Sequence, residues 1–431
     1  MNFWDTILNF LGTTGFVNFF SGDGWMNLIM VFIGCVLLFL AIVKKYEPYL
    51  LLPIAIGMIL VNILPGIYMT YTYSYALADG TTATFTTYSA LSESAFSSMN
   101  LATADSYATV LATQSISRGL LGYLHYGVEA EIYPCLIFIG IGATTDFGPL
   151  ISNKKTMFLG GAAQIGIFIA FIGALALGMI PGVDFTIGDA AGIGIIGGAD
   201  GPTAILVSNA LAQPKYTAGI ALAAYSYMAL VPVIFPPIIK LLTTKKERQI
   251  KMEMPREVSK REKILFPIIV TLVCCIIIPS CAPLIGCLMF GNLIKETGVV
   301  PNMVNTASNS LLYICTILLG LSVGATALGT TFLQLGTLMI FGLGILAFII
   351  AEAFGLLGGK LMCKLTKGKV NPMIGAAGVS AVPMAARVVH KIGQEEDPDN
   401  FLLMHAMGPN VAGVIGSAIA AGILLSMIAV I

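Results

Sequence analysis

The sequence predicts an all-α polytopic membrane protein whose inverted repeat carries two re-entrant or broken-helix hairpins that meet near the membrane midplane. Of the 431 residues, 57% are hydrophobic and only 10% are charged, and the mean hydropathy is +0.90. About a quarter of the residues in a soluble domain are charged. Apolar stretches of about 20 residues recur along the chain, and polar, glycine-rich breaks interrupt two of them. The formal net charge of zero gives no reason to expect nucleic-acid binding.

Residues 1–65 are expected to hold an interfacial amphipathic helix followed by two transmembrane spans. Trp4, Phe10, Phe16 and Phe19 suit the headgroup level of a bilayer, and no basic region typical of a signal peptide precedes them. A further short run at 283–294 is a candidate half-span. The predicted spans are residues 25–43, 49–64, 132–150, 157–178, 216–240, 264–279, 308–328, 333–357 and 401–428.

Lysine and arginine residues predict the orientation, because positively charged loops stay in the cytoplasm. The loop at 240–263 contains nine of the 22 basic residues, so it is expected in the cytoplasm of a cell inner membrane. Both termini are then outside. Residues 66–128 form an external insertion whose only basic residue is Arg118, and some local helix is expected in it.

Asp200 lies in a glycine-rich stretch, GGADGPT, inside sequence that otherwise reads as membrane. A full crossing by residues 191–209 would deliver the basic loop to the outside, against the charge rule. This segment is therefore expected to enter and return on the outer side, with Asp200 near its tip. A charged residue at that depth needs a cavity or a partner, so Asp200 is a candidate half of an ion site.

An internal repeat supplies the other half. The triplet GAT at Gly142 recurs at Gly324, and Gly197 and Pro202 recur at Gly378 and Pro383 with almost the same spacing. The charge pattern makes the two copies inverted, an arrangement that places a binding site where paired breaks meet. The expected units are residues 129–243 as the first repeat, 244–305 as a basic cytoplasmic loop with linking spans, and 306–431 as the second repeat.

The two breaks bring polar side chains together, namely Asp200, Thr203, Asn371, Ser380 and Arg387. Carboxylate, hydroxyl, amide and carbonyl oxygens suit a hard cation such as sodium. Arg387 repels a cation. It either pairs with Asp200 as a structural bridge or receives an anionic group such as a carboxylate, and the spacing does not choose between the two.

Three other polar residues are weaker signals. Tyr225 and Tyr227 interrupt the 216–240 span, where a tyrosine is more often a packed ring than a proton donor. Asn410 follows Gly408 and Pro409 and is expected to break the last helix. The break could expose a carbonyl oxygen that binds an ion, or it could be a kink with no role in ligand binding. The two interpretations are equally good.

Four motifs resemble the beta subunit of the biotin-dependent sodium-pumping decarboxylases, which act on oxaloacetate, methylmalonyl-CoA or glutaconyl-CoA. They are IIGGADGPT at 195–203, GATTDFGPL at 142–150, the stretch 371–387, and NFLLMHAMGPN at 400–410. The resemblance covers nearly the whole chain, but residues 66–128 are expected to depart from the family's pattern.

The resemblance implies that the subunit decarboxylates carboxybiotin and exports sodium. It implies sodium ligands at Asp200, Asn371, Gly375, Ser380 and Asn410. It further implies that Arg387 and Asn371 hold carboxybiotin and that Arg387, Tyr227 and Ser380 take part in catalysis. The implied partners are a carboxyltransferase subunit, a biotin-carrier subunit and a small membrane subunit, in an oligomeric complex.

Inverted repeats with paired hairpins also occur in secondary carriers, so a sodium-coupled carboxylate transporter is the alternative that the fold leaves open. An ion channel is poorly supported, because no carbonyl filter or ring of charges is apparent in the sequence.

Overall fold

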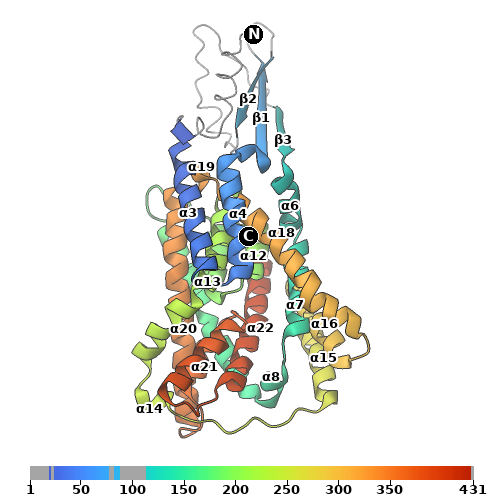
Figure 1. The fold of residues 1–431 in the computed structure, drawn as a ribbon, viewed down its shortest axis with the longest axis vertical. Helices are drawn as coiled ribbons and strands as arrows, with labels where there is room; N and C mark the ends of the chain where they lie inside the picture. The colour runs from blue at the N-terminus through green and yellow to red at the C-terminus, as the bar shows by residue number, and fades with distance from the viewer. Residues whose placement is uncertain (1–18, 21–23, 77–81, 88–112, 429–431) are drawn as a thin grey trace.

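A computed structural model describes residues 19–20, 24–76, 82–87 and 113–428, and it is mostly helical (Figure 1). Except for Phe19 and Phe20, the predicted N-terminal amphipathic helix lies outside the described residues. The helical elements are α3 (Gly24–Ile42), α4 (Pro48–Ile63), η1 (Pro65–Ile67), α6 (Leu120–Glu129), α7 (Ile132–Thr144), α8 (Gly148–Ser152), η2 (Lys154–Thr156), α9 (Met157–Ala163), α10 (Ile165–Leu177), α11 (Ile187–Ile195), η3 (Ile196–Gly198), α12 (Gly201–Leu211), α13 (Pro214–Leu242), α14 (Lys245–Arg248), α15 (Lys260–Ile277), η4 (Pro279–Cys281), α16 (Ala282–Thr297), α17 (Pro301–Asn305), η5 (Thr306–Leu311), α18 (Leu312–Ala325), α19 (Gly329–Phe332), α20 (Leu335–Leu365), η6 (Pro372–Gly378), α21 (Met384–Glu396) and α22 (Leu403–Ile428).

A three-stranded antiparallel sheet stands at one end of the bundle (Figure 1), with strand order β2-β1-β3. Its strands are β1 (Met69–Ala76), β2 (Thr82–Thr87) and β3 (Thr113–Arg118). The local helix expected at residues 66–128 is present among the described residues, in η1 and in α6. The sheet corrects the prediction of an all-α fold. The reason is local, because alternating threonine and tyrosine residues favour extended backbone, and β1 reads MTYTYSYA.

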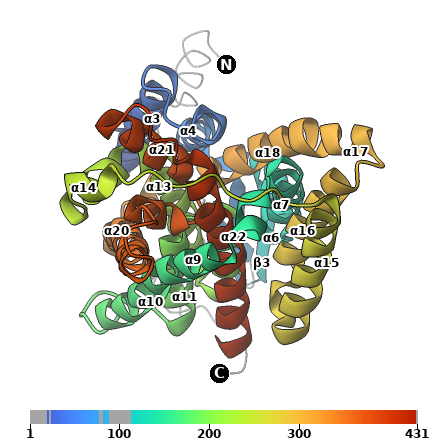
Figure 2. The ribbon, with the colours of Figure 1, turned by 90° about the horizontal axis from the view of Figure 1, so that it is seen from below.

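Five helical stretches in the described residues are long and apolar enough to cross a membrane, and counting two bent pairs raises the number to seven. The five confirm predicted spans: Gly24–Ile42, Lys154–Leu177, Pro301–Ala325, Leu335–Leu365 and Leu403–Ile428. One bent pair joins α6 to α7 and the other lies within α13, each with a bend of 64°. Seen from the end opposite the sheet, α22 runs between α20 with α9 and α10 on one side and α15 with α16 on the other (Figure 2).

The first interrupted segment is a hairpin made of α11, η3 and α12. A Cβ atom on Gly188, near the start of α11, would lie 1.9 Å from the carbonyl oxygen of Leu211, the last residue of α12. The two ends of the segment therefore lie together, as predicted for a re-entrant hairpin. Asp189 closes this base, because its carboxylate accepts hydrogen bonds from the backbone and the side chain of Gln213 at 2.7 and 2.6 Å.

The second interrupted segment combines η6, a short extended stretch and α21. Its two ends also lie together, because the side-chain amides of Asn371 and Asn400 both donate to the carbonyl oxygen of Arg248, at 3.0 and 2.9 Å. The turns of the two segments touch inside the bundle, where the backbone N–H of Ser380 donates to the carbonyl oxygen of Gly198 at 2.9 Å. The bundle core of buried alanine, isoleucine and valine side chains surrounds this junction.

Two helix pairs use the same close contact. Gly57 of α4 lies against the backbone of Leu321 in α18, and Gly291 of α16 lies against the backbone of Ile139 in α7. A Cβ atom at either glycine would approach the opposing carbonyl oxygen within 2.2 or 2.0 Å, respectively. Small residues allow helix backbones to pack this closely in membranes.

The close contact between α16 and α7 at Gly291 can be tested by substitution. We expect Gly291→Ala to lower the melting temperature of the purified protein, because the added methyl group would force the α7 and α16 backbones apart. Overpacking of this kind costs about 1–3 kcal/mol. Gly286→Ala on the same helix is the matched control, since nothing lies within 4 Å of its Cβ position. Equal melting temperatures for the two variants would contradict the close contact.

Candidate functional site

Asp200 lies at the turn of the first hairpin, between η3 and α12. Ala199 adopts a left-handed backbone with φ of 57°, and Asp200 then returns to extended geometry and caps α12. Its Oδ1 atom accepts the backbone N–H of Thr203 at 3.4 Å. Glycine on both sides and Pro202 at the helix start produce this turn locally. The side chain of Asp200 is buried, with only 5% exposed.

Two serine hydroxyls from the second half of the chain hold the other carboxylate oxygen of Asp200. Ser380, in the turn of the second interrupted segment, donates to Oδ2 at 3.1 Å, and Ser417 of α22 donates to it at 2.8 Å. The two hydroxyl oxygens lie 3.0 Å apart. The predicted convergence of Asp200 and Ser380 is therefore observed. Among the described residues, no basic side chain forms an ion pair with Asp200.

Two buried amides adjoin this cluster and each has an oxygen without a hydrogen-bond partner among the described residues, Oε1 of Gln164 and Oδ1 of Asn410. Gln164 packs against α22, and its Oε1 atom lies 3.5 Å from the Cβ position of Gly198. Asn410 donates to the carbonyl oxygens of Ala377 and Val379, at 3.1 and 2.7 Å. Asn410 thus ties α22 to the second turn. Because α22 continues through Pro409, the predicted helix break there is wrong.

The two tyrosines of α13 face different neighbours. The ring of Tyr225 lies against Gly201, directly after Asp200, with Cε1 2.3 Å from the Cβ position of that glycine. Its hydroxyl is buried without a hydrogen-bond partner among the described residues. Tyr227 packs against α20 and donates to the carbonyl oxygen of Phe341 at 2.5 Å. Tyr225 is therefore the tyrosine beside the Asp200 turn, and the catalytic role of Tyr227 stays a prediction.

Asn371 and Gly375 lie in the first half of the second interrupted segment, before its turn at Ser380. Asn371 caps η6 by accepting the N–H of Met373 at 3.0 Å, and its amide donates to the carbonyl oxygens of Arg248 and Ile250. Gly375 lets η6 touch the backbone of α20 at Gly355. The seven residues of η6 separate Asn371 from the serine cluster by roughly 14 Å at 2 Å per residue. Their predicted roles as sodium ligands are not tested by these contacts.

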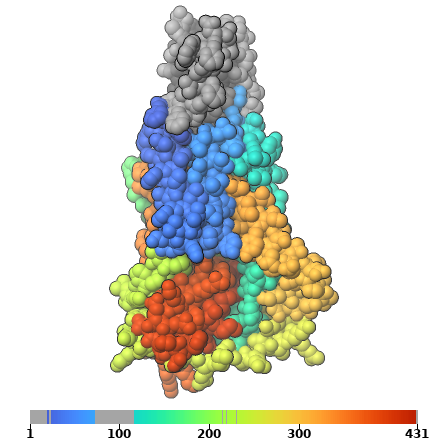
Figure 3. Space-filling view, viewed as in Figure 1, coloured from blue at the N-terminus to red at the C-terminus, as the bar shows by residue number. Residues whose placement is uncertain are grey.

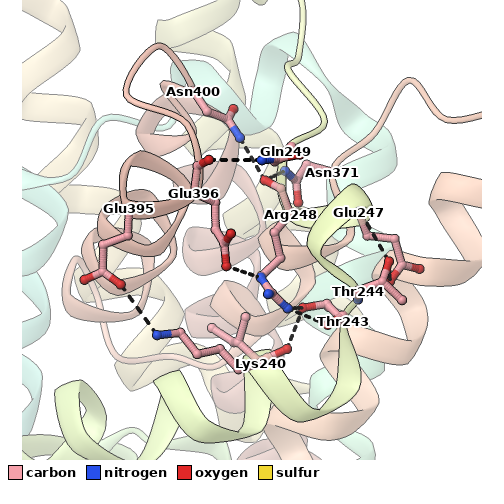
Figure 4. A network of polar contacts seen from close by, with 11 residues as sticks. Lys240, Thr243, Thr244, Glu247, Arg248, Gln249, Asn371, Glu395, Glu396 and Asn400 are labelled. Atoms are coloured by element: carbon pink, nitrogen blue, oxygen red, sulfur yellow. Dashed lines mark hydrogen bonds and ion pairs between the residues drawn. The ribbon is translucent and has the colours of Figure 1, made fainter.

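A polar clamp closes the base of the second segment (Figure 4). Arg248 binds Glu396 at the end of α21, with Nε 2.7 Å from Oε1, and both side chains are largely buried. The neighbouring pair of Lys240 and Glu395 is longer, at 3.7 Å, and about half exposed. The hydrogen bond from Lys251 lowers the pKa of Asp397 below its usual value. The basic loop is thus anchored on the second segment.

Arg387 lies on α21 and its side chain is exposed. The α21 region forms part of the molecular surface below α3 and α4 (Figure 3). Burial raises the pKa of Glu47, at the start of α4, and the charge of Arg387 opposes that rise. The sequence left two interpretations of Arg387, an ion pair with Asp200 or the binding of an anionic group. The ion pair with Asp200 is not observed. The guanidinium is accessible instead.

Sequence reasoning missed Ser417, Gln164 and Arg248. Ser417 and Gln164 are single polar residues inside apolar helices, a weak signal on its own. Arg248 is one of nine basic residues in its loop, and nothing in the loop distinguishes it. These three residues are distinguished only by their positions near Asp200 or Asn371. Those positions are known only once the chain is folded.

Comparison with protein families gives the match that decides the identity. Residues 26–428 match the model of the Na+-transporting oxaloacetate decarboxylase beta subunit. The chain belongs to this family. It functions as the beta subunit of a sodium-translocating decarboxylase, which decarboxylates carboxybiotin and couples that reaction to sodium transport.

Three relatives are similar over their full length. The beta subunit of methylmalonyl-CoA decarboxylase from Propionigenium modestum is 52% identical over 421 residues, which cover 98% of each chain. The oxaloacetate decarboxylase beta chain of Klebsiella pneumoniae is 50% identical, covering 95% of this chain and 98% of its own. The glutaconyl-CoA decarboxylase beta subunit of Acidaminococcus fermentans is 47% identical over 96% of each chain. The alignment with the first relative spans 98% of both chains and so includes residues 66–128.

The serine contacts can be tested by removing one hydroxyl. We expect Ser417→Ala to raise the sodium concentration for half-maximal decarboxylation by about tenfold or more, because a hydrogen bond to a charged group contributes about 1.5–3 kcal/mol and about 1.4 kcal/mol is a factor of ten. The measurement is the sodium dependence of decarboxylation by the reconstituted complex. Ser322→Ala is the control, since Ser322 is also buried and donates only to a carbonyl oxygen of its own helix. An unchanged sodium dependence in Ser417→Ala would remove this residue from the site.

The clamp can be tested by a double-mutant cycle on thermal unfolding. Alanine substitutions at Arg248 and Glu396 are expected to show a coupling energy of about 1–3 kcal/mol, since removing one partner leaves a largely buried charge unpaired. The same cycle at Lys240 and Glu395 is expected to give less than about 1 kcal/mol, as exposed pairs do. A coupling at Arg248 and Glu396 no larger than the exposed pair's would contradict the clamp.

Proposed function

We propose that Asp200, Ser380 and Ser417 together bind the sodium ion that this subunit transports. Their closest side-chain oxygens lie 2.8–3.1 Å apart, and carboxylate and hydroxyl oxygens are the ligands that hard cations prefer. The unpartnered amide oxygens of Gln164 and Asn410 offer further ligands beside the cluster. A single carboxylate without an ion-pair partner leaves the occupied site close to neutral.

In this proposal Asn371 and Gly375 act on the site through the shape of the second segment. The amide and carbonyl of the Asn371 side chain are already used by the clamp and by the cap of η6. Gly375 sets how closely η6 approaches α20. Asn410 fixes the upper end of η6 to α22, and its Oδ1 atom has no hydrogen-bond partner among the described residues.

We further propose that Arg387 receives the carboxylate of carboxybiotin. Its planar guanidinium binds a carboxylate through two parallel hydrogen bonds, and no acid in the described residues forms an ion pair with it. Only six residues separate it from Ser380, so one short segment carries both the anion and a sodium ligand. Moving one charge against the membrane potential costs about 2.3 kcal/mol per 100 mV. A shared segment lets sodium binding control the decarboxylation that supplies this energy.

The proposed orientation places the clamp and the basic loop in the cytoplasm and the β-sheet outside, with both termini outside. The basic residues concentrated at 240–263 support it through the charge rule. The two hairpins then enter from opposite sides and meet near the midplane as an inverted repeat. The paired glycine contacts of α4 with α18 and of α16 with α7 support that symmetry.

We propose that carboxybiotin arrives on a separate biotin-carrier subunit and that the other partners are a carboxyltransferase subunit and a small membrane subunit. The name beta subunit, shared by the relatives, supports a complex of several chains. The organic acid or acyl-CoA is chosen by the carboxyltransferase. The alternative of a sodium-coupled carboxylate transporter has only the hairpin architecture in its favour.

Two substitutions test the proposal in the complex reconstituted into lipid vesicles. Asp200→Asn removes the charge that binds sodium, so sodium should no longer stimulate decarboxylation. Arg387→Lys replaces the planar fork by a point charge, and the concentration of carboxybiotin for half-maximal turnover should rise. Lys391→Arg, at another exposed position of the same helix, is the control for Arg387. Undiminished carboxybiotin turnover in Arg387→Lys would exclude Arg387 from the binding role, and sodium-stimulated activity in Asp200→Asn would exclude Asp200.

A further inference from the structure

A cavity of about 340 Å³ lies on the sheet side of the first hairpin, among α4, α6, α12, α13 and α18. At about 30 Å³ per molecule it has room for on the order of ten waters. Its rim includes Tyr68, Glu129 and Lys215, of which Glu129 and Lys215 are exposed. Glu129 pairs with Arg118 at 2.9 Å and Lys215 pairs with Asp184. The charges at the mouth are therefore balanced, and neither sign of ion is excluded there.

The cavity is lined mainly by apolar side chains, with several polar residues among them. Asn209, Thr217 and Thr326 line it, together with His125. The His125 ring is buried and packs edge-on against Tyr68, with the ring centroids 5.4 Å apart. Its Nδ1 atom has no hydrogen-bond partner among the described residues. A buried polar atom of this kind is normally satisfied by water, which indicates a hydrated cavity.

The floor of the cavity lies one helical turn from the Asp200 turn. Ile205 lines the cavity and is four residues, about 6 Å, along α12 from Gly201. Ala221 lines it from α13 and is four residues from Tyr225. The Tyr225 ring covers Gly201, and its hydroxyl points to no partner among the described residues. The Tyr225 ring thus lies beside the Asp200 turn, one helical turn along α13 from the cavity wall.

From these observations we propose that the cavity is the outer vestibule of the sodium path and that Tyr225 closes it above Asp200. The inference rests on the proposed function, because it assumes that Asp200 binds the transported ion. The vestibule takes hydrated monovalent cations and water. Tyr225 is a gating side chain in this scheme, and its movement away from Gly201 connects the cluster with the outside.

Thiol labelling of the reconstituted complex tests the vestibule. The probe is a membrane-impermeant cationic methanethiosulfonate reagent added on the side away from the carboxyltransferase. Val61→Cys and Ile205→Cys place thiols on the cavity wall and floor. Leu60→Cys is the matched control, because Leu60 neighbours Val61 on α4 but does not line the cavity. The unsubstituted complex measures the labelling background, to which the eight cysteines of this subunit contribute.

We expect the reagent to modify Val61→Cys and Ile205→Cys and to cause loss of most sodium transport, with slower labelling at high external sodium. Leu60→Cys should keep its transport. Transport by both lining variants that is unaffected by the reagent, or labelling only from the cytoplasmic side, would overturn the vestibule. Sodium-stimulated decarboxylation by the unsubstituted complex is measured in parallel without the reagent. Its absence would overturn the proposed function and not the vestibule.

The gate is tested by sodium leak into vesicles without carboxybiotin. Tyr225→Ala should leak sodium, whereas Tyr225→Phe, which keeps the ring, should not. A tight Tyr225→Ala complex that still decarboxylates would exclude Tyr225 as the gate. The labelling experiment does not use this variant. If Tyr225→Ala fails to fold, labelling still tests the vestibule.

Discussion

The buried carboxylate of Asp200 is the constraint on which the rest of the structure depends. An ionised side chain inside an apolar bundle is costly unless other groups satisfy it. Here the second half of the chain does so through the hydroxyls of Ser380 and Ser417. Neither hairpin can form the site alone. The fold must therefore bring two distant segments to one point, and hold both of them there.

The bases of the two hairpins show how this is achieved. Asp189 joins the ends of the first hairpin through Gln213, and the carbonyl oxygen of Arg248 joins the ends of the second through Asn371 and Asn400. Between the bases, close glycine contacts let the interrupted segments lie against continuous helices. The clamp at Arg248 also connects the basic loop to the segment that carries Ser380. A partner bound at that loop would therefore contact the same segment that carries Ser380.

The sequence alone was sufficient for the outline of this arrangement. The spacing of glycines and the distribution of lysines predicted the Asp200 hairpin, because those signals depend on local backbone and on overall charge. Ser417 was not predictable, since an isolated serine in an apolar helix resembles many packing residues. The strands at residues 66–128 were missed because the segment was interpreted by charge, although its alternating threonine and tyrosine pattern favours extended backbone. Tyr225 and Tyr227 are two positions apart, so only packing separates the one beside Gly201 from the one on α20.

The central claim is that the carboxylate of Asp200 and the hydroxyls of Ser380 and Ser417 form the cation site. Crystals of the subunit grown with thallium(I), a monovalent cation that scatters anomalously, test it directly. The account predicts an anomalous peak bounded by Asp200, Ser380 and Ser417 that weakens as sodium is added. A sodium-sensitive peak elsewhere in the bundle, with none at this cluster, would contradict it.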